Sequence, residues 1–306
     1  MPLIVGGSQV SNIPYTTQEW IERYPHFQEI ATHLIKQPVR KVNKKKLLYV
    51  MQRELAVIAP REDDTIEIIG TEDATTCHIG IITHSGSKAV GLCHFDGYET
   101  EQCCKRMVEK LKLLSHGIPG RLELHLIGGF MDDRKISMNL TKELSDAFHD
   151  CDEEIHIATF CVTDLNDVLK GEIHFPVIYG VGVDVKTGEI FRAEFPDKGP
   201  ALNLRHSRIF AGVDKIWDIY DNDKHQLIVE PFSFVSGAVY QAKMWSKAPD
   251  SMILEHLSTS GDQEPEGYAD QVRNVFKFIL ANPDTTTIFN GKSLRFNLNA
   301  DGQWTQ

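Results

Sequence analysis

The stretch GTEDATTCHIGIITHSGSKAVGLCHFDG, residues 70–97, predicts two strands on either side of a Ser-Gly-Ser turn. A two-residue loop at Ser85–Gly86 and a four-residue loop from His84 to Ser87 give the same antiparallel pairing, in which Cys77 lies directly opposite His94. Directly opposed residues share one face of a sheet, with Cβ atoms roughly 4.5–5.5 Å apart. The stretch therefore predicts a thiol beside an imidazole, above an apolar floor. A three-residue loop would put His94 on the other face unless a bulge restored the pairing.

Helical and strand periodicities along the rest of the chain predict an α+β fold. Strands outnumber helices and most neighbours look antiparallel, so we expect helices to cover a sheet or a pair of sheets. Residues 258–267, rich in Ser, Gly, Pro and acidic residues, are predicted as a surface loop with some flexibility rather than a domain linker. The predicted helices cover 27–34, 102–115, 132–148 and 271–280, and the predicted strands cover 55–59, 65–69, 77–84, 88–94, 121–127, 154–162, 176–185, 189–195, 216–220 and 226–230.

Composition excludes several classes of protein. The 306 residues carry 25% charged and 42% hydrophobic side chains, which is typical of a globular chain rather than a disordered one. No apolar run is long enough to span a membrane, and the start MPLIVGGSQV lacks the basic segment of a signal peptide. We therefore expect a cytoplasmic chain, or one also present in the nucleus, whose six cysteines are reduced. The net charge of −11 argues against binding to nucleic acid.

A cysteine beside a histidine is an arrangement that thiol catalysis uses. A free thiol has a pKa of about 8.5 and is mostly protonated at neutral pH. An imidazolium at about 4 Å contributes on the order of 4 kcal/mol at an effective dielectric of 20, and lowering the pKa by two units needs about 2.7 kcal/mol. His94 could therefore activate Cys77 and later protonate a leaving group. A third group should orient the imidazole, and Thr71, Asp73 and Thr75–Thr76 are the nearby candidates.

Two alternatives compete with catalysis at this hairpin. A cytosolic cysteine is commonly a small buried hydrophobic residue, and an apolar floor would raise its pKa and make it inert. Zinc could be bound by Cys77–His78 and Cys93–His94, but adjacent strand residues point to opposite faces, so the four side chains cannot converge on one ion. We therefore predict no metal and no other cofactor.

The segment GGFMDDR, residues 128–134, joins a predicted strand to a predicted helix. Asp132 or Asp133 could cap the N-terminus of that helix. The functional alternative is a loop near the site, whose carboxylates bind a cationic group of a substrate.

Five segments resemble the protein N-terminal asparagine amidohydrolase family: LLYVMQRELA (47–56), EDATTCHIG (72–80), GRLELHLIGGFMDDR (120–134), HFPVIYG (174–180) and EHLSTS (255–260). They are spread over most of the chain, which favours one continuous domain over residues 1–306. The resemblance implies that the chain hydrolyses the side-chain amide of an N-terminal asparagine, giving aspartate and ammonia. In the N-degron pathway that aspartate is then arginylated, which marks the protein for degradation. The resemblance also implies that Cys77 is the nucleophile.

A more distant resemblance links the chain to chemotaxis-receptor glutamine deamidases. The spacing from Cys77 to His94 is similar to theirs, and Thr71 falls where their hydroxyl residue stands. The resemblance implies His94 as general acid and base, Thr71 as the residue that orients its imidazole, and a layered sandwich of mainly antiparallel sheets with helices packed on one side. Backbone N–H groups near Thr76–Cys77 could hold the oxyanion of a thioester mechanism.

Selectivity for an N-terminal residue requires a group that binds the free α-amine. The carboxylates of Glu54, Asp73 and Asp132 are candidates, and each is also an ordinary turn or surface residue. Pro2 would become a free amine after removal of Met1 and could lie near the site, or could be an ordinary trimmed terminus. The expected partners are proteins or peptides with a free N-terminal Asn. Alternative functions are another thiol acyltransferase or cysteine hydrolase, and a non-catalytic module that binds N-termini.

Overall fold

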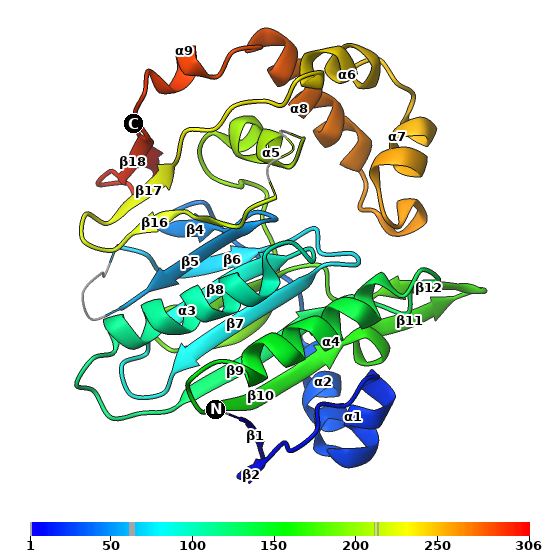
Figure 1. Ribbon diagram of the computed structural model, residues 1–306, viewed down its shortest axis with the longest axis vertical. Helices are drawn as coiled ribbons and strands as arrows, with labels where there is room; N and C mark the ends of the chain where they lie inside the picture. Colours follow the sequence, from blue (N-terminus) through cyan, green and yellow to red (C-terminus); the bar gives the residue numbers. More distant parts are fainter. Residues whose placement is uncertain (1, 61–64, 211, 213) are drawn as a thin grey trace.

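The structure is a computed structural model that describes residues 2–60, 65–210, 212 and 214–306. Its centre is a twisted sheet of eight strands, here called the large sheet (Figure 1). In order across this sheet the strands are β15 (Trp217–Asp218), β5 (Glu54–Ile58), β8 (Val90–Phe95), β7 (His78–His84), β9 (Leu122–Gly128), β10 (Ile155–Val162), β1 (Leu3–Val5) and β2 (Ser8–Gln9).

Two long helices, α3 (Thr100–Leu114) and α4 (Ile136–His149), cover one face of the large sheet (Figure 1). Met107 of α3 and Leu144 of α4 share a buried cluster with Leu124 of β9, which is what their helical spacing of apolar residues predicts. The helices α1 (Thr17–Arg23) and α2 (His26–Lys36) lie beside β10, and α2 packs on that strand.

The other face of the large sheet packs against a second sheet of five strands. Ile81 and Leu92 of the large sheet share a core with Ile69 and Val183 of the second sheet. The layers are therefore helix, sheet, sheet, and most strand pairs are antiparallel, so the predicted α+β class is confirmed. In order, the strands of the second sheet are β3 (Arg40–Lys41), β14 (Ile190–Glu194), β13 (Val181–Asp184), β6 (Ile68–Thr71) and β4 (Leu47–Tyr49).

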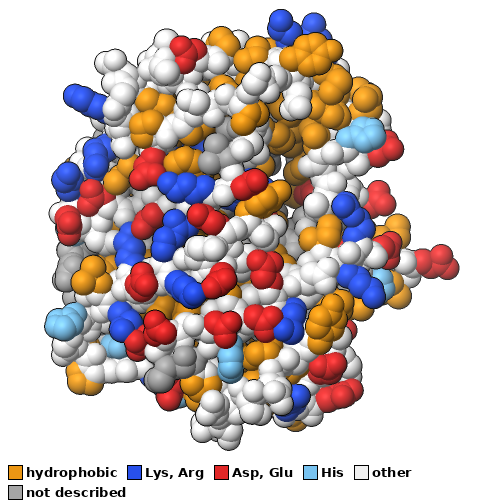
Figure 2. Space-filling view, in the orientation of Figure 1, with side chains coloured by type: hydrophobic (Ala, Val, Ile, Leu, Met, Phe, Trp, Pro, Cys, Tyr) orange, Lys and Arg blue, Asp and Glu red, His pale blue; other side chains and the backbone are white. Residues whose placement is uncertain are grey.

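The C-terminal part of the chain adds a helical cluster beyond the strand ends (Figure 1). Val272 and Phe276 form its core. On the face drawn in Figure 2, apolar side chains gather over this cluster, whereas mixed charges cover the helical layer of the sandwich. The helices are α5 (Leu202–Phe210), α6 (Ala238–Trp245), α7 (Asp250–Leu257), α8 (Tyr268–Ala281) and α9 (Thr286–Phe289).

Short strands and turns complete the chain. The hairpin predicted from 216–220 and 226–230 is present as β16 and β17, in a four-stranded sheet with β18 and β19. Among the described residues no helix is both long and apolar enough to cross a membrane. The remaining elements are η1 (Thr163–Asn166), β11 (Asp167–Lys170), β12 (Ile173–Pro176), β16 (Tyr220–Asp221), β17 (Gln226–Val229), η2 (Gly261–Gln263), β18 (Leu294–Leu298) and β19 (Trp304–Thr305).

The hairpin of β7 and β8 is present, but its predicted register is wrong by two residues. Ile79, not Cys77, lies opposite His94, and a four-residue turn over 85–88 closes the hairpin with a bond from His84 N to Ala89 O (2.9 Å). A shift of two residues conserves the face, because side chains alternate with a period of two. Cys77 and His94 therefore remain on one side of the sheet, as diagonal rather than direct neighbours.

Candidate active site

A cavity of about 390 Å³ opens where the ends of the two sheets meet the helical cluster. Cys77 and His94 both line it. Arg53 adds a cation from the sheet side, and Glu264 and Tyr268 line the wall contributed by the C-terminal part of the chain. The predicted thiol and imidazole therefore share one concave site.

The loop before β7 positions Cys77. The Cys77 carbonyl accepts a hydrogen bond from Gly129 N (2.9 Å), so the GGFMDDR segment lies against the cysteine. A Cβ at Gly128 would lie 2.6 Å from the Cys77 carbonyl oxygen, and the φ of Gly128 is +127°. Only glycine fits there, because any side chain would displace the segment that carries the thiol.

His94 is held by a residue of the other sheet. Its Nδ1 lies 2.8 Å from the hydroxyl of Thr71, at the end of β6. Its Nε2 is buried and has no hydrogen-bond partner among the described residues. If Nδ1 carries the proton and donates it to Thr71, Nε2 is left with a free lone pair beside the cavity. The geometry thus brings Thr71, predicted from spacing, into contact with His94.

Burial favours the neutral forms of both Cys77 and His94. It raises the pKa of the Cys77 thiol well above its usual value, and the negative charges of Asp96 and Glu264 raise it further, against the opposing effect of Arg53. Burial also lowers the pKa of His94 to about 4. The expected thiolate held by an imidazolium is therefore not the resting state at neutral pH. The pair rests as a thiol and a neutral imidazole.

The Arg53–Asp96 ion pair, which the sequence did not reveal, borders the cavity. Arg53 Nε lies 2.6 Å from Asp96 Oδ2, and the guanidinium stacks 3.7 Å from the ring centre of Tyr98. Arg53 N also donates to the carbonyl of His94 (3.0 Å). Arg53 has a positive φ of 60°, an uncommon conformation for a bulky side chain, which marks a constrained position beside the site.

The segment 258–264 supplies the opposite wall of the cavity through Ser258, Thr259 and Glu264 and is bonded to the segment that carries Cys77. The hydroxyls of Thr76 and Thr259 lie 2.8 Å apart, and Thr75 Oγ1 lies 3.5 Å from Glu264 Oε1. Ser258 also donates to Glu264. Burial raises the pKa of Glu264 to about 7. The predicted surface loop is thus part of the site, and the family-like segment EHLSTS was the sequence signal that could have located it.

Comparison with known proteins identifies the family of this chain. The family model for protein N-terminal asparagine amidohydrolase matches residues 37–306. The chain belongs to this family. It is 41% identical to the protein N-terminal asparagine amidohydrolase of Sus scrofa over 100% of this chain and 98% of the relative. The corresponding values for the Homo sapiens protein of that name are 42%, 99% and 97%, and for the Arabidopsis thaliana protein 25%, 85% and 81%.

Two of the three predicted α-amine readers of this amidohydrolase are already paired with cations. Glu54 is 1% exposed and its carboxylate forms ion pairs with Arg205 and Arg208. Glu54 is not among the residues that line the cavity. Asp73 does line the cavity, but its carboxylate is bound by Lys198. The geometry therefore leaves neither carboxylate free for a substrate amine.

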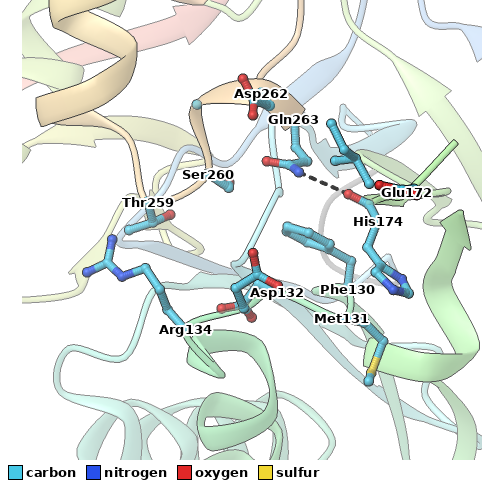
Figure 3. Close-up of a pocket in the computed structure, with 13 residues that line it drawn as sticks. Phe130, Met131, Asp132, Arg134, Glu172, His174, Thr259, Ser260, Asp262 and Gln263 are labelled. Carbon is cyan, nitrogen blue, oxygen red and sulfur yellow. Dashed lines mark hydrogen bonds between the residues drawn. The ribbon is translucent and has the colours of Figure 1, made fainter. Parts of the chain in front are cut away.

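Asp132, the third predicted reader, lies at a neighbouring cavity of about 310 Å³ (Figure 3). Its two carboxylate oxygens accept from Ile136 N (2.9 Å) and Ser137 N (2.8 Å) in the first turn of α4. Asp132 therefore binds the first N–H groups of α4, as the helix-capping alternative expects, but from outside the N-cap position, which Lys135 occupies. Thr259 lines both cavities, so they adjoin, but neither Cys77 nor His94 lines this second one.

Pro2 lies far from the cavity. It precedes β1, whose Leu3 pairs with Ile155 at the start of β10. The cavity end of the sheet is the other end of β10, where Val162 pairs with Gly128. The length of β10 and three strand spacings, from β7 across β9 and β10 to β1, therefore separate Pro2 from Cys77.

The histidine next to Cys77 faces away from it. His78 is buried, and its Nε2 lies 2.7 Å from Thr141 Oγ1 of α4. Cys77 and His78 therefore point to opposite faces of the sheet, as predicted. In the part of the chain that the structure describes, no three His, Cys, Asp or Glu side chains are placed to share a metal ion.

Proposed function

We propose that this chain hydrolyses the side-chain amide of an N-terminal asparagine to aspartate and ammonia through a thioester on Cys77. The observation that carries the proposal is the hydrogen bond between His94 Nδ1 and the Thr71 hydroxyl (2.8 Å), beside an Nε2 that has no partner among the described residues and belongs to a residue lining the same cavity as Cys77. Family membership supports the reaction class, since the matched relatives are named for this activity.

The first step begins from the neutral pair. His94 Nε2 removes the thiol proton while Cys77 Sγ attacks the amide carbon, so a C–S bond forms and the carbonyl electron pair moves onto oxygen. Asp96, Asp73 and Glu54 raise the pKa of His94 and so favour the imidazolium that forms, although burial outweighs them at rest. Thr71 keeps the ring oriented by accepting from Nδ1–H. Backbone N–H groups near Thr76–Cys77 are the proposed donors to the oxyanion.

The second step releases ammonia. The oxyanion collapses, the C–N bond breaks, and the imidazolium of His94 gives its proton to the departing nitrogen. Water then attacks the thioester while His94 takes one of its protons, and breaking the C–S bond returns the thiol. One amide and one water thus become one carboxylic acid and one ammonia.

We place this reaction in the N-degron pathway, at the step before arginylation of the new N-terminal aspartate. Such a role fits a chain of the cytoplasm, or of the nucleus as well. All six cysteines are free.

Ammonia release from short peptides tests the proposal. A peptide that begins with Asn should release ammonia, its Nα-acetylated form should not, and Cys77→Ala should abolish the release. Equal reaction of both peptides, or full activity of Cys77→Ala, would contradict it.

Two further assays separate the alternative functions. Transfer of the acyl group to an added amine in preference to water would indicate an acyltransferase. Iodoacetamide that reacts with Cys77 no faster than with a free model thiol, in the absence of ammonia release, would indicate a binding module.

A further inference from the structure

Four carboxylates line the cavity, and three of them already have a cation. Asp96 pairs with Arg53, and Glu72 and Asp73 both pair with Lys198. The fourth, Glu264, forms no ion pair with any described residue. Glu264 is therefore the carboxylate of this cavity whose charge the protein leaves uncompensated.

Hydrogen bonds hold Glu264 without neutralising it. Ser258 and Thr75 both donate to the same oxygen, Oε1. The other oxygen, Oε2, accepts no hydrogen bond from the described residues. Glu264 is half-buried. A carboxylate there with one held and one free oxygen is arranged to receive a cationic donor, because withdrawing an unpaired charge from water is costly.

We propose that Glu264 binds the free α-ammonium group of the substrate and so restricts the reaction to N-terminal residues. This inference rests on the proposed amidohydrolase function and names the residue that reads the substrate's amine. In asparagine, only two atoms, Cα and Cβ, separate the α-nitrogen from the carbon of the side-chain amide. A reader of the amine must therefore lie close to Cys77. Glu264 meets this requirement, because it is bonded to Thr75 in the loop that carries Cys77.

The charge on Glu264 also couples binding of the substrate amine to ionisation of the Cys77 thiol. That charge raises the pKa of the Cys77 thiol, as does the charge of Asp96. When a substrate ammonium pairs with Glu264, it cancels part of this effect. The thiol is then easier to ionise when an amine is bound than when the cavity holds an amide without one. Glu264 should therefore affect both KM and kcat.

Two matched peptides and two variants test this inference. One peptide begins with Asn, and the other carries a succinamoyl group in its place, which keeps the side-chain amide and lacks the α-amine. In the wild-type enzyme we expect the free-amine peptide to have a much higher kcat/KM. Glu264→Gln should lower kcat/KM for that peptide by at least about thirtyfold, the effect of truncating one partner of a buried charge pair. The same variant should hydrolyse the succinamoyl peptide at least as fast as the wild type does, because removing the charge of Glu264 makes the Cys77 thiol easier to ionise. That activity also shows that the variant folds.

Glu266→Gln is the matched control, because Glu266 is exposed on the same loop and lines neither cavity. It should keep the wild-type ratio of the two kcat/KM values. The inference is overturned if Glu264→Gln also keeps that ratio, or if the wild type hydrolyses both peptides equally well. A wild-type enzyme that hydrolyses neither peptide would instead contradict the proposed function itself.

Discussion

The two walls of the cavity differ in how they are built. The sheet wall presents Cys77 and His94, and Thr71 is buried behind it against His94; all three lie in or beside buried strands of two packed sheets. The loop wall consists of residues 258–264, with a single short 3-10 turn, fastened to the sheet wall by the bonds of Thr75 and Thr76. Groups that transfer protons need fixed geometry, which strands provide. The loop wall supplies the uncompensated carboxylate, so our account assigns reaction to one wall and substrate selection to the other.

The largest expected effect is on the sheet wall. Cys77→Ser should lower kcat for an Asn-initiated peptide by on the order of 10⁴-fold or more, because a hydroxyl is a far weaker nucleophile than a thiol. Cys161→Ala provides the control, since Cys161 is buried in the core and does not line the cavity. It should alter the melting temperature and leave kcat close to the wild-type value. Substantial activity in Cys77→Ser would remove the nucleophile from our account.

A smaller effect is expected at Thr71, which positions the imidazole without touching the substrate. Thr71→Val keeps the shape and removes the hydroxyl on His94 Nδ1, so kcat should fall by about 10- to 100-fold with little change in KM. Thr71→Ser restores a hydroxyl and should recover most of the rate. If both variants lose the same activity, the role of Thr71 is packing, and the sheet wall has only two functional members.

The pH dependence of kcat/KM reports on the loop wall. The pKa of Glu264 is about 7, so its ionised fraction should rise about tenfold between pH 6 and pH 8. The α-ammonium of the substrate, with a pKa of about 7.8, loses part of its charge over the same range, so kcat/KM for a free-amine peptide should rise by about fourfold. Asp73, Tyr179, Tyr268 and Cys77 are the other titratable groups around Glu264, and the pKa values of both tyrosines and of the thiol are raised above this range. Glu264→Gln should lack this rise; its persistence in the variant would assign it to another group.

The smallest effect concerns stability. Burial raises the folded-state pKa of Glu264 from 4.5 to about 7, so the folded protein holds this proton more tightly than the unfolded chain does. Stability associated with this group is therefore present below pH 4.5 and is lost as pH rises through about 7. Glu264→Gln has no carboxylate to ionise at this position and should not lose stability in this way as the pH rises. Its melting temperature relative to the wild type should be higher by a few degrees at pH 8 than at pH 5, measured by thermal denaturation. No change of this difference with pH would mean that the carboxylate is not buried as described.

The two walls also differ in how far the sequence predicts them. Cys77 and His94 belong to one hairpin, so alternation alone placed them on one face. The exact register of the hairpin could not be predicted, because contacts with a distant segment of the chain determine the turn. Gly86 lies against the carbonyl of Pro119, and Ser85 N donates to Arg121 O (3.0 Å). Local pattern carries no information about such contacts.

The loop wall could not be predicted from local pattern at all. The bond from Thr75 to Glu264 joins residues 189 positions apart. Likewise, Glu54 lay in a family-like segment and resembled a free carboxylate, and only the fold brings Arg205, 151 positions away, against it. The resemblance to EHLSTS marked the neighbourhood without revealing which acid was free. Which carboxylates are paired with cations depends on the folded structure of the cavity. That pairing distinguished the carboxylates considered as binders of the substrate α-amine.

The most direct test of the central claim is a rapid-quench experiment that measures the intact mass of the enzyme. Wild-type enzyme is mixed with an Asn-initiated peptide, quenched in acid and digested to locate any acylated residue. We predict a transient thioester on Cys77 whose mass corresponds to the peptide minus ammonia, absent with the Nα-acetylated peptide. Ammonia release without any adduct on Cys77, or an adduct on another residue, would contradict the account.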